Sequence, residues 1–256
     1  MSVTAVLLSG GLDSAVLVAE EAARPGGNVQ PIYVSVGLAW EDAERAVVSR
    51  LLASPLFHAR VRPLVTLSVD MRDVYDATHW AVQGQPPAYH TPDEDVYLPG
   101  RNVILLGKAG VFCAAARIDR LVLGTLGHNP FPDATPEFRS AMAEALSLGL
   151  AHPLTIEAPY ADVGKIDVVR RGAELGVPFG LTLSCMNPRG FGIRDSGFGR
   201  DSVSHESHQS HESRIPNPKS PLHCGLCSKC RERHDAFVDA GLADPTEYAD
   251  ARYVDV

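Results

Sequence analysis

Short apolar runs alternate with amphipathic stretches along the first part of the chain. Apolar residues dominate 4–8, 29–36 and 61–70. Runs of this length predict buried strands when polar or turn-forming residues bound them. The intervening segments 14–23 and 40–54 predict helices, and the apolar positions of the second recur at helical spacing. These positions are Ala43, Val47, Val48, Leu51 and Leu52.

The same alternation continues through the middle of the chain. The elements it predicts are a buried helix at 101–117, a strand at 119–126 and helices at 135–150 and 162–176, with a loop rich in Pro and His at 79–95. Thr135 is the expected N-cap of the helix at 135–150, and Gly176 is expected to end the helix at 162–176. Strands that alternate with helices predict a Rossmann-like α/β fold, with a parallel sheet flanked by helices.

The turn after the first strand is suited to binding an anion. It lies in "VLLSGGLDSAVL", which joins the first strand to the first helix. Gly10 and Gly11 let the backbone approach a ligand and aim successive N–H groups at it, and the helix adds the positive end of its dipole. Ser9 and Ser14 add hydroxyl donors. The pattern G-x-x-x-x-G-K-[ST] of P-loop enzymes is absent, so cleavage between the β- and γ-phosphates is not indicated.

Four of the five cysteines are expected to bind one metal. "HCGLCSKC" places Cys224, Cys227 and Cys230 at two-residue spacings, which lets thiolates face one ion from a turn and a beginning helix. Cys185 in "TLSCMNP" is the natural fourth ligand. Structural zinc is the favoured metal, and an iron–sulfur cluster is the alternative. Cys113 lies in an apolar run and is expected to be a core thiol.

Composition narrows the class of protein. The chain has 256 residues, 45% of them apolar, and a net charge of −8. The length suits one large domain, with or without an appendage, and the negative charge favours a small-molecule substrate over direct nucleic-acid binding. No apolar run reaches about 18 residues, and the first residues lack the basic region of a secretion signal. We therefore expect a cytoplasmic protein without a membrane span.

One segment differs from the rest in composition. Residues 187–221 are rich in Ser, Gly, Pro, Arg and His and poor in aliphatic side chains, which predicts a long flexible insertion. His205, His208 and His211 recur within it; a solvated tract is favoured over a metal site. The expected division is a nucleotide- and substrate-binding domain at 1–184 and a zinc-binding region at 185–256.

The sequence resembles known enzymes at several motifs. "SGGLDS" resembles the SGGxDS signature of the PP-loop ATP pyrophosphatases, which split ATP into AMP and pyrophosphate. "YLPGRN", "FPDATPEF", "GKIDVVRRGAELGVPF" and the cysteine motifs resemble, in the same order, those of the QueC (ExsB) family of 7-cyano-7-deazaguanine synthases. The resemblance extends along nearly the whole chain.

The resemblance implies a reaction and roles for individual residues. The enzyme would convert 7-carboxy-7-deazaguanine, ammonia and ATP into the nitrile through an adenylated intermediate, as a homodimer with one zinc per subunit. The residues that would bind ATP are Leu8, Ser9, Gly10, Gly11, Leu12, Asp13 and Ser14. Asp13 would order the turn or help to hold Mg²⁺. Arg101 and Lys165 would neutralise phosphate charge, the alternatives being a structural ion pair for Arg101 and a solvated helix face for Lys165.

The resemblance also assigns roles to two further carboxylates, and departures from the family pattern leave a different substrate as an alternative. Asp133 and Glu137 would bind substrate or Mg²⁺, although Glu137 also suits a plain first-turn position in a helix. The chain departs from the family where it reads "YVSVG", at 129–131 and at Thr135. The alternative is therefore a QueC-like adenylating enzyme that acts on another carboxylate or on a protein acceptor. A nucleotide-binding module without turnover and a tRNA-modifying enzyme are further alternatives.

Overall fold

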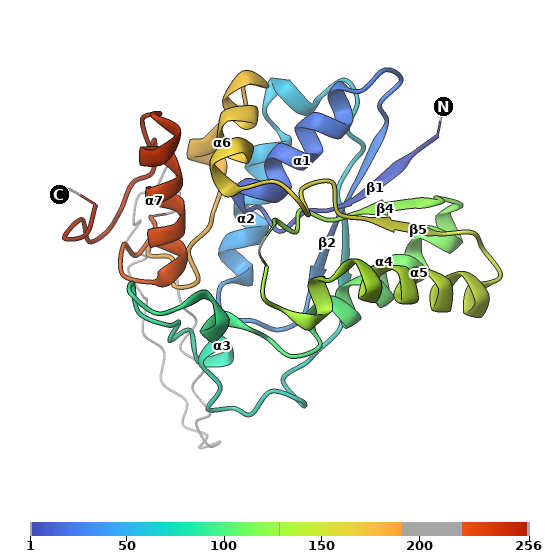
Figure 1. The fold of residues 1–256 in the computed structure, drawn as a ribbon, viewed down its shortest axis with the longest axis horizontal. Coiled ribbons are helices and arrows are strands. Elements are labelled where there is room, and N and C mark those ends of the chain that lie inside the picture. The colour runs from blue at the N-terminus through green and yellow to red at the C-terminus, as the bar shows by residue number, and fades with distance from the viewer. Residues whose placement is uncertain (1, 128, 191–221, 255–256) are drawn as a thin grey trace, which may run out of the picture.

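In the part of the chain that the structure describes, five parallel strands form one twisted sheet at the centre of the fold. The computed structural model describes residues 2–127, 129–190 and 222–254 (Figure 1). The strands are β1 (Thr4–Leu7), β2 (Val29–Ser35), β3 (Val65–Ser68), β4 (Arg120–Val122) and β5 (Thr155–Glu157). Their order is β3-β2-β1-β4-β5, and all neighbours pair in parallel. The predicted parallel sheet is confirmed, and the chain crosses from one half of it to the other beside β1.

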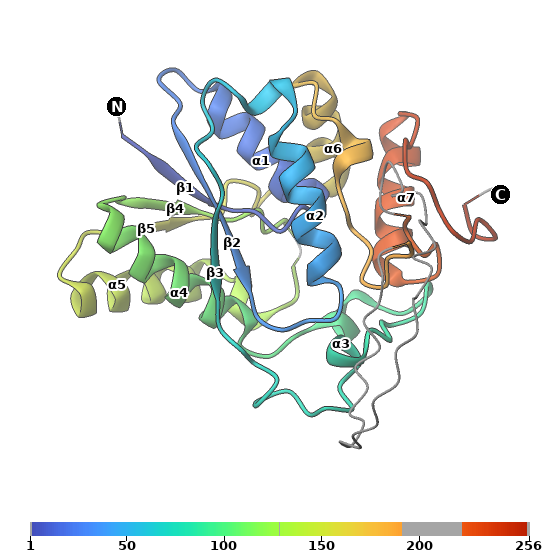
Figure 2. The same ribbon diagram turned by 180° about the vertical axis from the view of Figure 1, so that it is seen from behind.

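Helices cover both faces of this sheet. They are α1 (Leu12–Ala23), α2 (Glu41–Leu52), α3 (Trp80–Gln83), α4 (Arg101–Ala116), α5 (Pro136–Leu150), α6 (Lys165–Glu174) and α7 (Ser228–Ala240). Figures 1 and 2 show α1, α2 and α6 on one face and α4 and α5 on the other. The C-terminal helix α7 lies beside α6, beyond the first layer of helices.

Each face of the sheet has its own hydrophobic core. Val6 of β1 packs with α1 and α6 on one side, and Ala5 packs with α4 on the other. This alternation follows from the two-residue side-chain period of a strand. Cys113 is fully buried in the second core, so its expected role as a packed thiol is confirmed.

The element boundaries agree with the sequence patterns in most places. Helix α1 begins at Leu12 and not at Ser14, so the last residues of the loop at 9–14, called the glycine loop below, are already helical. Thr135 caps α5 as predicted, because its Oγ1 accepts from the N–H of Phe138 at 3.1 Å. Gly176 follows α6 with φ +71°, which suits the predicted helix end. Strand β5 was not predicted.

The C-terminal part of the described chain shares the core of the sheet. Phe237 of α7 packs edge-on against Phe179, and both belong to the core that contains Val6. The division at residue 184 stays a prediction. Most of the predicted insertion, with its three histidines, lies at 191–221, outside the described residues. Among the helices that the structure describes, none combines the length and apolar character of a membrane span.

Candidate functional site

The glycine loop ends β1 and places the start of α1 at the carboxyl edge of the sheet. Gly10 has φ +82°, and a Cβ there would lie 3.0 Å from Cγ2 of Val48, so this position requires glycine. The loop is tied internally, because the N–H of Gly11 donates to Ser9 Oγ at 3.3 Å and Ser14 Oγ donates to Gly11 O at 3.0 Å. No side chain caps α1 among the described residues. Its first N–H groups are therefore available to an anion.

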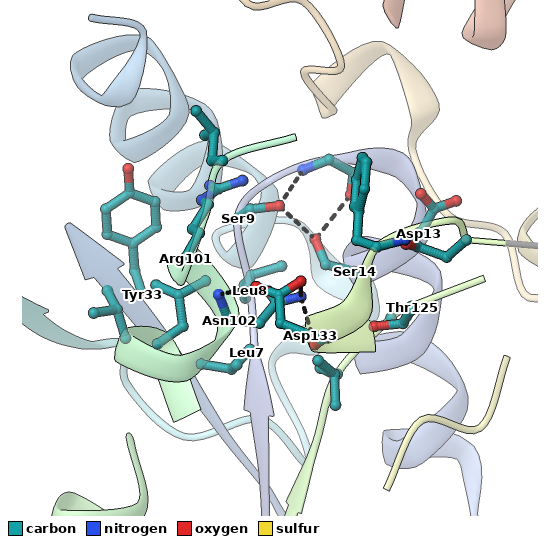
Figure 3. Close-up of a pocket in the computed structure, with 18 of the residues that line it drawn as sticks. Leu7, Leu8, Ser9, Asp13, Ser14, Tyr33, Arg101, Asn102, Thr125 and Asp133 are labelled. Carbon is teal, nitrogen blue, oxygen red and sulfur yellow. Dashed lines mark hydrogen bonds between the residues drawn. The ribbon is translucent and has the colours of Figure 1, made fainter. Parts of the chain in front are cut away.

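A cavity of about 280 Å³ opens beside this loop. Its floor is apolar and comes from the strand ends, including Leu7, Ile32 and Leu123. Its polar rim includes Ser9, Ser14, Thr125 and Arg101 (Figure 3). The cavity thus lies beyond the carboxyl ends of β1, β2 and β4, where parallel α/β sheets bind ligands. An apolar floor with a rim of hydroxyls and a guanidinium suits a nucleotide or another flat anionic ligand.

Asp133 supports the residues on the opposite side of the cavity. Its Oδ2 accepts from the N–H of Asn102 at 3.0 Å, and its backbone oxygen accepts from Asn102 Nδ2 at 3.1 Å (Figure 3). These bonds hold the start of α4 and, with it, the neighbouring Arg101. Asp133 is buried and lines the cavity, so it acts first as a structural partner of Asn102; substrate binding by Asp133 stays a prediction.

Arg101 and Glu137 differ in their access to the cavity. Arg101 lines it, and its Nε has no hydrogen-bond partner among the described residues. Arg101 forms no salt bridge in the described part of the chain, although its positive charge acts to lower the pKa of the neighbouring Glu44 carboxyl. Glu137 lies in the first turn of α5. It is exposed and does not line the cavity.

Lys165 forms a partly buried ion-pair cluster beside the loop. Its Nζ lies 2.6 Å from Asp13 Oδ2 and 2.9 Å from Glu232 Oε1. Burial alone would disfavour the charged ammonium, but the two carboxylates outweigh it and raise the pKa of Lys165 above its ordinary value. Lys165, the first residue of α6, is therefore a permanent cation beside the start of α1, which does not fit a solvated helix face. Sequence reasoning named Asp13 and Lys165 but did not pair them, and it missed Glu232.

Glu44 is a second residue that sequence reasoning missed. It lines the cavity, where it accepts hydrogen bonds from Tyr33 Oη at 2.8 Å and from Trp40 Nε1 at 3.1 Å. Burial raises its pKa to about 7. Its position gave a usable signal, because residue 44 shares the helix face of Val47 and Val48, and a carboxylate on an apolar face needs buried partners.

The four predicted cysteines come together in one buried cluster. The Sγ atoms of Cys185, Cys224, Cys227 and Cys230 all lie within 4.8 Å of one another. The Cys224–Cys230 and Cys227–Cys230 sulfur distances are 3.8 and 3.5 Å. Tetrahedral zinc with bonds of about 2.3 Å requires sulfurs about 3.8 Å apart, so the spacing fits a single ion.

The backbone around this cluster is arranged for thiolates. The N–H of Cys224 points at Cys185 Sγ at 3.2 Å, and the N–H of Leu226 points at Cys224 Sγ at 3.4 Å. Gly225 has φ +76°, and a Cβ there would lie only 1.8 Å from Asp250 O. The turn therefore requires glycine at this position. The cluster fixes the start of α7, which carries Cys230.

Comparison with known proteins places these features in a family. The sequence model described as "Queuosine biosynthesis protein QueC" matches residues 3–241. A protein from Methanopyrus kandleri named 7-cyano-7-deazaguanine synthase is 32% identical, and the match covers 97% of this chain and 99% of that protein. A protein of the same name from Azoarcus sp. is 30% identical, with 95% of each covered. A solved structure of a predicted tRNA methyltransferase subunit from Methanocaldococcus jannaschii is 15% identical with a TM-score of 0.44, over 68% of this chain and 75% of that one.

Proposed function

The chain belongs to the QueC family, and we propose that it is a 7-cyano-7-deazaguanine synthase. In this proposal it converts 7-carboxy-7-deazaguanine and ammonia into the nitrile and splits ATP into AMP and pyrophosphate. The observation that carries the proposal is the similarity to enzymes of that name, 32% identical over 97% of this chain. A match of this extent leaves no large part of the relative's enzyme unaccounted for.

The glycine loop is proposed to bind the pyrophosphate half of ATP. The available N–H groups at the start of α1, the hydroxyls of Ser9 and Ser14 and the cation Lys165 supply positive potential there. The adenosine half would occupy the apolar floor. Mg²⁺ would enter with the phosphates and neutralise part of their charge. Asp13 is already paired with Lys165, so its proposed role is to order the loop.

Arg101 is proposed to act at the other end of the phosphate chain. Its guanidinium lines the cavity, and a planar guanidinium binds two oxygens of one phosphate well.

A carboxylate is a poor electrophile because its leaving group is oxide. Adenylation replaces that leaving group with AMP, so ammonia can displace AMP and form the amide. A second adenylation on the amide oxygen, followed by loss of AMP and of the nitrogen protons, leaves the nitrile.

The cysteine cluster is proposed to hold structural zinc. Sulfur spacing that suits one ion and the burial of all four thiols favour zinc over an iron–sulfur cluster. Such an ion would join the chain before and after residues 191–221 and would fix the start of α7. Its contribution is to the stability of the fold.

Subunit assembly and location belong to the same proposal. A homodimer is expected from the family resemblance and a cytoplasmic location from the sequence pattern, and light scattering on the purified protein tests the first. The division into a nucleotide-binding part at 1–184 and a zinc-binding part at 185–256 is likewise proposed.

The test is a product assay on the purified zinc-loaded protein. The protein is incubated with ATP, Mg²⁺, ammonium and 7-carboxy-7-deazaguanine, and AMP and the deazapurines are followed by liquid chromatography and mass spectrometry. The expected result is the nitrile with two AMP for each molecule formed. AMP without any change in the deazapurine would overturn the proposed substrate and leave another acceptor. The absence of both products would overturn the proposed reaction.

A further inference from the structure

Glu232 links the C-terminal helix α7 to the glycine loop. Its Oε1 lies 2.9 Å from Lys165 Nζ, and the same ammonium lies 2.6 Å from Asp13 Oδ2. The side chains of Lys165, Asp13 and Glu232 are 17%, 24% and 22% exposed. One cation at the start of α6 therefore joins the first turn of α1 to the second turn of α7.

The position of Glu232 is fixed from both sides. It follows Cys230 by two residues, so it stands one half-turn beyond the cysteine cluster. Lys229 Nζ lies 2.5 Å from Glu232 Oε2. The next residue, Arg233, is fully buried and donates to Thr182 Oγ1 at 2.8 Å and to Phe179 O at 2.9 Å. The ion pair with Lys229 and the buried hydrogen bonds of Arg233 therefore leave the Glu232 carboxylate few rotamers and little backbone movement.

The ammonium of Lys165 has more donors than it uses here. A lysine ammonium carries three N–H donors, and two of its acceptors in the described part of the chain are Asp13 and Glu232. Within residues 2–127, 129–190 and 222–254, the third donor has no further acceptor and is available to a ligand. Asp13 lines the cavity, so an acceptor on a ligand in the loop would meet this donor close to Asp13. Because a lysine side chain is long and flexible, its ammonium keeps one position only where a fixed partner such as Glu232 holds it.

We propose that Glu232 is a positioning residue for the phosphate-binding loop: it holds the Lys165 ammonium over the start of α1 and so couples the cysteine cluster to binding of the pyrophosphate part of a nucleotide. The inference rests on the proposed use of ATP. Glu232 makes no contact with substrate in this role. Loss of Glu232 should weaken binding of nucleotides that carry the β- and γ-phosphates and should spare the binding of AMP.

The test compares two probes by isothermal titration calorimetry on the zinc-loaded protein. The probes are α,β-methylene-ATP, whose α–β bridge cannot be cleaved, and AMP. In Glu232→Gln, we expect the dissociation constant of α,β-methylene-ATP to rise about tenfold and that of AMP to stay within twofold. Glu232→Asp keeps the charge but withdraws it by one methylene, and we expect a rise of about threefold. Asp235→Asn removes an exposed carboxylate from the same helix and should change neither constant.

The results for the variants test the role of Glu232, and the result for the wild-type protein tests the proposed use of ATP. Equal weakening of both probes in Glu232→Gln would show a general structural role and overturn the inference, as would unchanged binding of both. A tenfold loss in Asp235→Asn would also overturn it, because the effect would then not depend on Lys165. Metal content measured on every variant excludes zinc loss as the cause. If the wild-type protein binds no α,β-methylene-ATP, the proposed use of ATP fails, and this inference fails with it.

Discussion

Replacement of Lys165 by methionine tests the ion-pair cluster most sharply. Methionine keeps most of the side-chain volume and removes only the cation. Glu232 keeps a partner in this variant, because Lys229 Nζ lies 2.5 Å from it. Asp13 does not, because its Oδ2 pairs with Lys165 and its Oδ1 is buried without a hydrogen-bond partner among the described residues. The variant therefore leaves the partly buried carboxylate of Asp13 unpaired.

The size of the effect follows from that unpaired charge. Removing one partner of a buried ion pair costs about 3–5 kcal/mol, and the remaining exposure of Asp13 reduces this cost. We expect Lys165→Met to lower the free energy of unfolding by about 2–4 kcal/mol at pH 7.5. An unpaired buried carboxyl has a raised pKa in the folded state. Its penalty is therefore full at high pH and shrinks as the pH falls toward the ordinary pKa of an aspartate.

The assay is urea denaturation of the zinc-loaded protein at pH 7.5 and pH 5.5, with pyrophosphate release measured beside it. The double variant Asp13→Asn/Lys165→Met carries no charge at either position, so it should recover most of the lost stability. Neither variant should release pyrophosphate at more than about 1% of the wild-type rate, because the loop has lost its cation. A Lys165→Met protein as stable as the wild type, or a double variant no more stable than Lys165→Met, would refute the reasoning.

Three further predictions concern other parts of the site. Cys227→Ser should lower both zinc content by metal analysis and unfolding free energy by denaturation, whereas Cys113→Ala should keep its full metal content; full zinc in Cys227→Ser would contradict the cluster. Ser14→Ala should reduce pyrophosphate release about 10- to 100-fold, since a hydroxyl bond to a charged group contributes about 1.5–3 kcal/mol, and an unchanged melting temperature is the control. The pKa of Glu44 in the folded protein is raised from 4.5 to about 7, so the free energy of unfolding of the wild-type protein should fall by about 3 kcal/mol as the pH rises from 4.5 to 7. In urea denaturation, the Glu44→Gln protein should not show this fall; an equal fall in both proteins would show that Glu44 does not titrate in this range.

Local patterns explain why most of the sheet and its loop are predictable. The strand β1, the two glycines and α1 follow one another directly, so one short stretch of sequence determines the anion site. The same holds for α4, predicted at 101–117 and found at Arg101–Ala116. Strand β5 is different, because only Ile156 of its three residues is buried. Its place depends on pairing with β4, which no local pattern records.

The site shows the same contrast between local and distant information. The cysteine cluster could be predicted because thiols have few other uses at two-residue spacing. The contact between Asp13 and Lys165 joins α1 to α6, and Glu232 arrives from α7. Charges that meet only in the folded chain leave no periodic signal. Glu44 is intermediate, since its partner Tyr33 is distant on β2 but its place on an apolar helix face is visible in the sequence.

The transfer of oxygen from substrate to AMP tests the proposed chemistry most directly. 7-Carboxy-7-deazaguanine labelled with ¹⁸O in both carboxyl oxygens is converted in unlabelled water with ATP, Mg²⁺ and ammonium, and the AMP is analysed by mass spectrometry. Two successive adenylations predict that each AMP carries one ¹⁸O atom and that no label enters the water. Unlabelled AMP, or formation of ADP in place of AMP, would contradict an adenylated carboxylate and the account built on it.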